Sequence, residues 1–152
     1  SDIEQSFSAT PDAASCRFVA SRLEMTEEEI IFTPGVVSNI FKRAMSHLYV
    51  STSIEKRKYQ FRDRCSRSVY LEESVELPRK ASLAYQPATD MVSGTGASFK
   101  GGYSVEGKQL KVTENMKFNK RIYDPEDWGS FRETVMSQNK IAEEPVILKF
   151  DL

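Results

Sequence analysis

The sequence predicts a mainly β domain, an antiparallel β-sandwich of about seven or eight short strands with one or two helices. Three observations support this fold class. Apolar and polar residues alternate over long stretches, Gly- or Pro-containing turns separate the stretches, and only two segments have apolar residues at helical spacing. A mixed α+β arrangement is the alternative.

The first third of the chain contains two strand patterns and one helix pattern. Strands are predicted at 16–23 and 28–32, on either side of an acidic connection. Thr33 and Pro34 then have the residue types of a helix start, with Thr as the cap and Pro in the first turn. Helical spacing predicts one apolar face there, formed by Val36, Val37, Ile40, Phe41, Met45 and Leu48.

Alternation dominates residues 56–77. Tyr59 and Phe61 share one parity, and the arginines that follow take the other, as expected when successive side chains of a strand point to opposite faces. The strand pattern continues over 69–77, until a proline ends it.

The clearest local signal is a β-hairpin at 103–112. Its two arms alternate on either side of a turn that contains Gly107, and the second arm continues to Ile122. Before it, a short strand is predicted at 83–85, and the Gly- and Ser-rich residues 90–102 are predicted to form a loop or an irregular edge.

The strongest helix start is Asp124 followed by Pro125, because Asp caps, Pro fits the first turn and two further acids favour the positive end of the helix dipole. The sequence therefore predicts a helix over 125–139. A last strand is predicted at 146–150. The apolar stripe of the helix is formed by Trp128, Phe131 and Val135.

Length and charge set the limits of the interpretation. A chain of 152 residues predicts one domain over 1–152. The formal net charge of −1 gives no field that would favour nucleic acid, and no apolar run is long enough for insertion into a membrane. The residues 1–10 do not have the pattern of a signal peptide.

Two cysteines and one histidine are the residues to consider for catalysis. Cys16 and Cys65 lie in no Cys-x-x-Cys or Cys/His cluster, so no zinc site is predicted. We expect two free, buried thiols, and a disulfide between them is the alternative. A small Cys/His hydrolase would need the fold to bring His47 to one of them, and no local protease signature surrounds either.

Other charged and glycine-rich stretches have simpler interpretations. The basic residues of 55–67 are interleaved with aromatics, a pattern that can bind single-stranded nucleic acid, but the wet face of one strand explains it better. The acids 27–29 lack the spacing of a calcium loop, and the glycines at 94–96 and 101–102 lack the context of a phosphate loop. No catalytic, cofactor-binding or metal-ligating residue is therefore predicted.

The end of the chain resembles a known family. A basic strand (117–122), a turn with Pro and acids before an aromatic (123–128), a helix, and the apolar strand at 146–149 resemble the C-terminal end of a bacterial domain of unknown function that follows a transglutaminase-like core. The strand ending in Leu77-Pro78 and the hairpin at 103–112 also fit this family.

The resemblance implies a β-sandwich at the C-terminal end of a larger, exported cell-envelope protein, in the periplasm or at the cell surface. It implies a non-catalytic accessory or interaction domain whose partner is the preceding transglutaminase-like domain, since no position here matches the catalytic motif of that core. The alternative function is a glycan- or peptide-binding module, which an exposed row of the tyrosines 59, 70, 85 and 103 would favour.

Overall fold

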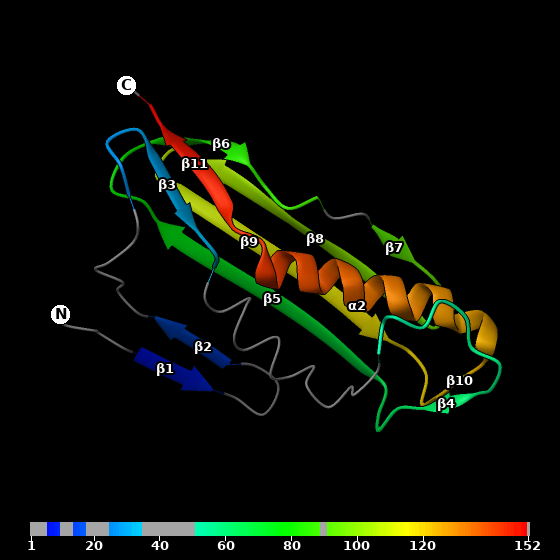
Figure 1. Cartoon of the computed structure of the whole chain (residues 1–152). Helices are drawn as coiled ribbons and strands as arrows, with labels where there is room; N and C mark the ends of the chain where they lie inside the picture. The colour runs from blue at the N-terminus through cyan, green and yellow to red at the C-terminus, as the bar shows by residue number, and fades with distance from the viewer. Residues whose placement is uncertain (1–5, 10–13, 18–24, 35–50, 89–90, 152) are drawn as a thin grey trace.

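The computed structural model describes residues 6–9, 14–17, 25–34, 51–88 and 91–151, and in these residues the chain is mostly antiparallel β (Figure 1). A 3₁₀ turn, η2 (Pro125–Asp127), leads into the helix α2 (Trp128–Glu143). The strands are β1 (Ser6–Ala9), β2 (Ala14–Arg17), β3 (Glu29–Phe32), β4 (Phe61–Arg62), β5 (Arg67–Glu76), β6 (Ala81–Tyr85), β7 (Val92–Ser93), β8 (Ala97–Glu106), β9 (Gln109–Phe118), β10 (Ile122–Tyr123) and β11 (Val146–Phe150).

The largest sheet has four strands in the order β5-β9-β8-β7, all antiparallel. Strand β9 is central and pairs along its whole length with both neighbours. Gly107 has φ 60°, the left-handed conformation that glycine adopts without steric cost, and it allows the tight turn from β8 into β9.

One face of this sheet is buried and the other is polar. Along β9 buried and more exposed side chains alternate, because successive residues of a strand point to opposite faces. We call the buried side the inner face. On β9 it carries Leu110, Val112, Glu114, Met116 and Phe118.

Helix α2 lies across the inner face (Figure 1). Gly101 of β8 permits this close approach, because a Cβ atom there would lie 2.6 Å from Ile141 Cδ1 and 2.8 Å from Phe99 Cζ. The helix buries one side only, made of Trp128, Phe131, Thr134, Ser137, Gln138, Ile141 and Ala142.

A three-stranded sheet in the order β3-β11-β6 follows α2 in the same layer. The turn after α2 leads directly into β11, whose Val146 and Leu148 are fully buried in the common core. Within the described residues the second layer over the four-stranded sheet is thus shared between a helix and a small sheet.

Phe131 is the centre of an aromatic cluster at the other end of α2. Its ring centroid lies 4.9 Å from Phe61 of β4, 4.8 Å from Phe118 of β9 and 4.9 Å from Tyr123 of β10. The ring of Trp128 stacks beside it at 5.9 Å. Since aromatic pairs at these distances add about 0.5–1.5 kcal/mol beyond area burial, this cluster fixes the start of the helix.

The predicted fold class is confirmed: the protein is mainly antiparallel β with a helix after Asp124. Strands at 28–32, 69–77, 83–85 and 146–150 and the hairpin at 103–112 all correspond to observed strands. The helix predicted over 125–139 begins as η2 and continues one turn further, to Glu143.

For residues 90–102 the prediction of a continuous loop is wrong, whereas its alternative, an irregular edge, agrees with β7, a two-residue strand at the edge of the four-stranded sheet. The first half of β8 also lies in this stretch, because Gly101 permits the approach of α2 and both glycines pair in the ladder rather than forming a turn. The second arm of the hairpin also does not run unbroken to Ile122: β9 ends at Phe118, and Asn119 donates its backbone N–H to the carbonyl of Gly96 instead.

Alternation at 56–62 was a poor guide to secondary structure. Only Phe61 and Arg62 are in a strand, and Tyr59 is 81% exposed. The stretch before them is held by side chains: Trp128 Nε1 donates to the carbonyl of Ile54 at 2.9 Å.

The beginning of the chain differs from its prediction where it is described. Residues 6–9, for which no strand was predicted, form β1 and pair with β2, which includes the first two residues of the strand predicted at 16–23. Residues 18–24 and the predicted helix with its face from Val36 to Leu48 lie outside the described residues.

The two adjacent glycines of β8 give a matched test of the packing of α2. We expect Gly101→Ala to lower the free energy of unfolding by about 1–3 kcal/mol, because the new methyl group would overlap Ile141 and Phe99. Gly102→Ala is the control, since nothing lies within 4 Å of its Cβ position. Urea unfolding of both variants measures the difference, and equal stabilities would contradict the proposed close approach.

Candidate functional site

A buried acidic pair lies on the inner face of the four-stranded sheet. Glu114 of β9 is fully buried, and its cross-strand neighbours are Leu71 on β5 and Gly101 on β8. Glu73, two residues along β5, points to the same face and is also buried. Two carboxyl groups on one apolar face are unusual, because a buried charge needs a partner.

Neither carboxyl oxygen of Glu114 has a hydrogen-bond partner among the residues that the structure describes. Burial raises the pKa of Glu114 to about 8, with a further contribution from the carboxylate of Glu73. Glu114 is therefore mostly a neutral acid at pH 7. Burial also raises the pKa of Tyr103 on the neighbouring strand, whose hydroxyl likewise has no partner in the described part of the chain.

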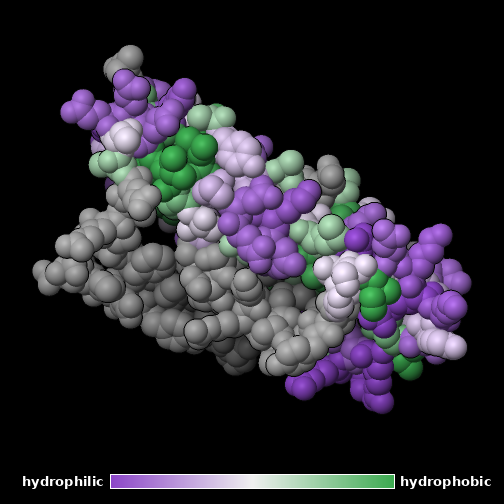
Figure 2. All heavy atoms as spheres, in the orientation of Figure 1, coloured by the Kyte–Doolittle hydropathy of each residue, from purple (hydrophilic) through white to green (hydrophobic). Residues whose placement is uncertain are grey.

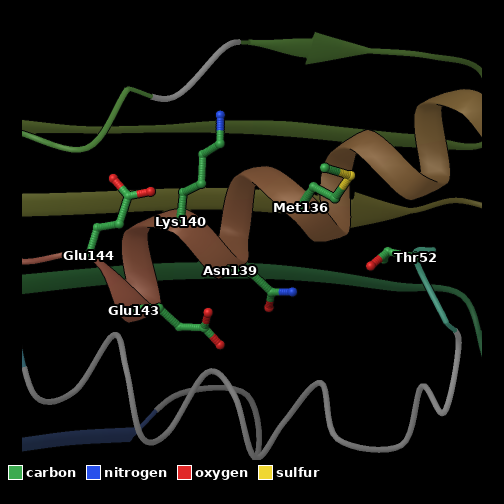
Figure 3. Close-up of a pocket in the computed structure, with 6 residues that line it drawn as sticks. All are labelled: Thr52, Met136, Asn139, Lys140, Glu143 and Glu144. Atoms are coloured by element: carbon green, nitrogen blue, oxygen red, sulfur yellow. The ribbon is translucent and has the colours of Figure 1, made fainter.

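A shallow pocket lies on the side of α2 that faces away from the sheet. It has a volume of about 260 Å³, near the lower end of the range of ligand sites. Figure 3 shows that Asn139 and Glu143 extend to one side of the helix while Lys140 and Glu144 extend to the other. Because these polar ends do not converge on one point, the pocket does not define a small-molecule site.

The outer face of the three-stranded sheet carries an apolar row. Ile31, Ile147 and Tyr85 are directly opposite one another across β3, β11 and β6. Ile31 and Tyr85 are both 45% exposed. In Figure 2 strongly hydrophobic side chains gather where β3 and β11 lie in Figure 1. We call Ile31, Ile147 and Tyr85 the apolar row.

An irregularity in β6 places Tyr85 in this row. The register shifts between Ile147 and Leu148, so that Leu83 pairs with the buried Leu148 while Tyr85 pairs with Ile147. A bulge of this kind re-aims the following side chain to the other face. The hydroxyl of Tyr85 then donates to Glu144 Oε2 at 3.1 Å, which joins the row to the end of α2.

Polar groups form the border of the apolar row. Lys149 on β11 and Glu29 on β3, each two residues along its strand from the row, form an ion pair at 3.6 Å. Glu144 borders the opposite end. An apolar centre with a charged border is the arrangement found at protein–protein interfaces.

Asp127 is the centre of a polar cluster at the start of α2. Its carboxylate accepts two hydrogen bonds from Lys120 Nζ, at 2.9 and 2.7 Å, and one from the backbone N–H of Asp124 at 3.0 Å. The hydroxyl of Thr95 donates at 3.2 Å. The bonds from Lys120 are the main reason that the pKa of Asp127 lies below its ordinary value. This cluster ties β7–β8, β9–β10 and α2 together and is structural.

The structure does not assemble the cysteine–histidine candidates. Cys65 is a free thiol and is exposed, so the expectation that it is buried is wrong. It follows a short strand rather than lying within one, and Arg67 donates to its carbonyl and to Sγ. Only the backbone is described at Cys16, and His47 lies outside the described residues.

Some arginines of the basic stretch 55–67 pack against other side chains instead of lying in solvent. The guanidinium of Arg57 stacks 4.6 Å from the ring of Phe61 and 4.3 Å from that of Trp128. Arg67 pairs with the buried Asp63 at 3.0 Å. These arginines therefore have structural contacts.

The tyrosines do not form a row in the part of the chain that the structure describes. Tyr59 precedes β4, Tyr70 is 63% exposed on the outer face of β5, and Tyr85 lies on the other sheet. Tyr103 points to the inner face. Three of the four tyrosines are thus exposed, but they do not share one sheet face.

Among the described residues, no three His, Cys, Asp or Glu side chains cluster as metal ligands would. None of their helices has the length and apolar character that crossing a membrane requires.

The buried Glu114 could have been predicted from the sequence, whereas the apolar row could not. Glu114 shares the parity of Val112 and Met116 in the predicted hairpin, so an acid on the apolar side of that strand was a usable signal. The apolar row had none, because it depends on the register of strands far apart in the chain and on the bulge in β6.

The geometry defines the class of this protein as a mostly β domain with a helix on one face of its main sheet. The family model of a Domain of Unknown Function (DUF3858), whose description notes a solved structure, matches residues 28–148. Because this match spans most of the chain, the chain belongs to that family. None of the curated proteins matches it.

A crystal structure from Parabacteroides distasonis ATCC 8503, described as a "putative protease", has a similar fold. The two are 15% identical with a TM-score of 0.58, so the likeness shows the fold alone. The match covers 82% of this chain and 24% of the solved chain. The fold thus occurs there as about a quarter of a longer polypeptide.

The Asp127 cluster gives a second test. We expect Asp127→Asn to destabilise the protein by about 1–3 kcal/mol at pH 7, because it weakens several hydrogen bonds of a buried carboxylate. The lowered pKa makes this contribution complete above the ordinary carboxyl pKa, and it disappears as the pH falls through the lowered value. Glu126→Gln, an exposed acid of the same turn, is the control.

Thermal unfolding from pH 7 down to pH 2 measures both variants against the native protein. The difference between Asp127→Asn and the native chain should narrow at the acid end, while Glu126→Gln stays close to the native chain throughout. A difference that does not depend on pH would contradict the assigned role of the carboxylate.

Proposed function

We propose that this chain is a non-catalytic accessory domain of a longer, exported cell-envelope protein with a transglutaminase- or protease-like core, and that it packs against that core. The observation that carries the proposal is the apolar row, Ile31–Ile147–Tyr85, exposed on the outer face of the three-stranded sheet. Exposed apolar side chains inside a charged border are typical of a surface that another folded domain covers.

The comparisons support a place within a longer chain. This fold accounts for 24% of the solved chain that it resembles, and a protease description belongs to that whole chain. The resemblance of residues 117–149 to a domain that follows a transglutaminase-like core agrees with this placement. The catalytic groups would then belong to the core, and the site of action would be the periplasm or the cell surface.

The absence of catalysis by this chain is directly testable. We expect the purified chain to release no fluorescence from labelled casein and to attach no primary-amine probe to casein above the level of buffer. Each assay is repeated with Cys65→Ser, Cys16→Ser and His47→Ala. Turnover by the native chain that any of these substitutions abolishes would overturn the proposal.

The apolar row is tested in the longer polypeptide that we propose contains this chain. We expect Ile31→Lys with Ile147→Lys to separate the melting of this domain from that of the core, giving two calorimetric transitions instead of one, because a buried lysine at an interface is costly. Ser74→Lys, on the outer face of β5, is the matched control. One joint transition in the double variant would contradict the assigned surface.

A further inference from the structure

Glu114 is a titratable residue at the interface between α2 and the four-stranded sheet. It lies on the inner face beside Gly101, and Ile141 of α2 closes over that glycine. The α2 side of this interface also carries Thr134 and Gln138, which are buried one turn apart. The side chain of Glu114, at this interface, is fully removed from water.

The interface between α2 and the sheet holds several buried polar atoms that have no hydrogen-bond partner among the described residues. They are both carboxyl oxygens of Glu114, Tyr103 Oη on β8 and, on α2, Thr134 Oγ1 and Gln138 Nε2. A buried polar group without a partner destabilises the folded state, and a charged one does so more strongly. The interface therefore tolerates a neutral acid far better than a carboxylate.

The charged surroundings act in the same direction. From β5, the carboxylate of Glu73 opposes a negative charge on Glu114. From β8, Tyr103 is itself kept neutral by burial and by Glu114, Glu73 and, at the end of α2, Glu144. Among the charges that act on Glu114 or Tyr103 within the described residues, each is an acid, so a carboxylate at Glu114 receives no compensation from them.

We propose that Glu114 makes the packing of α2 on the four-stranded sheet depend on proton binding: the neutral acid keeps the helix closed on the inner face, and loss of the proton favours its opening. This inference does not rest on the proposed accessory role. It assigns to the α2–sheet contact a pH-sensitive step that operates within the domain.

The difference in pKa between the closed and open states determines the direction of the pH dependence of α2 opening and the pH range over which it occurs. The closed state holds the proton up to a pKa of about 8, whereas an open, hydrated carboxyl has its ordinary value near 4.5. Between these values the closed state binds more protons, so its advantage declines as the pH rises. The opening constant of α2 should increase about tenfold per pH unit across that interval and level off above it.

Hydrogen exchange of the intact chain tests the proposal. The opening constants of the α2 backbone amides are measured from pH 5.5 to 7.5 after correction for the intrinsic exchange rate. We expect the tenfold rise per unit in the native chain and a nearly flat profile in Glu114→Gln, which keeps the shape and cannot ionise. Glu76→Gln, an exposed acid at the end of β5, should retain the native slope.

Two results would overturn the inference. One is a slope that persists in Glu114→Gln. The other is an equal slope in the amides of the β8–β9 ladder, which would indicate unfolding of the whole domain rather than opening of α2. Should Glu114→Gln not fold, ¹³C titration of the Glu114 carboxyl in the native chain decides: a midpoint near the ordinary value rejects the proposal, and one raised by several units supports it.

Discussion

The packing of α2 on the inner face of the four-stranded sheet is the contact on which the rest of the structure depends. Phe131 holds one end of it, because its ring touches aromatic rings from β4, β9 and β10. Gly101 admits the other end, where Ile141 approaches the sheet. With both ends fixed, the chain leaves α2 directly into β11, and the three-stranded sheet forms where the helix stops.

The fold was predictable where local chemistry and tertiary packing agree. The hairpin at 103–112 needed only alternation and the left-handed residue Gly107. Pro125 and the acids beside it were enough to predict the helix start after Asp124. The carboxylate that accepts a hydrogen bond from the backbone N–H of Asp124 is that of Asp127. Such features depend on neighbours a few residues away, which a sequence displays directly.

Prediction failed where a distant partner decides the outcome. Gly101 was interpreted as part of a loop or an irregular edge, yet it lies inside a ten-residue strand, where Ile141 occupies the space that a side chain would take. Tyr59 had the parity of a strand residue but is exposed, because the segment before β4 is held by Trp128 and not by a ladder. The apolar row depends on strand register, which residue types alone do not specify.

The order of the strands in the small sheet has a kinetic consequence. Strands β8 and β9 are joined by a tight turn, so their ladder can form as soon as both are available. In contrast β11 must find β3, which comes from the other end of the chain, and closing so long a loop is slow. We expect β11 to dock last. Until then its apolar residues stay in water, and the folding intermediate most prone to aggregation is the one in which the final strand has not yet paired.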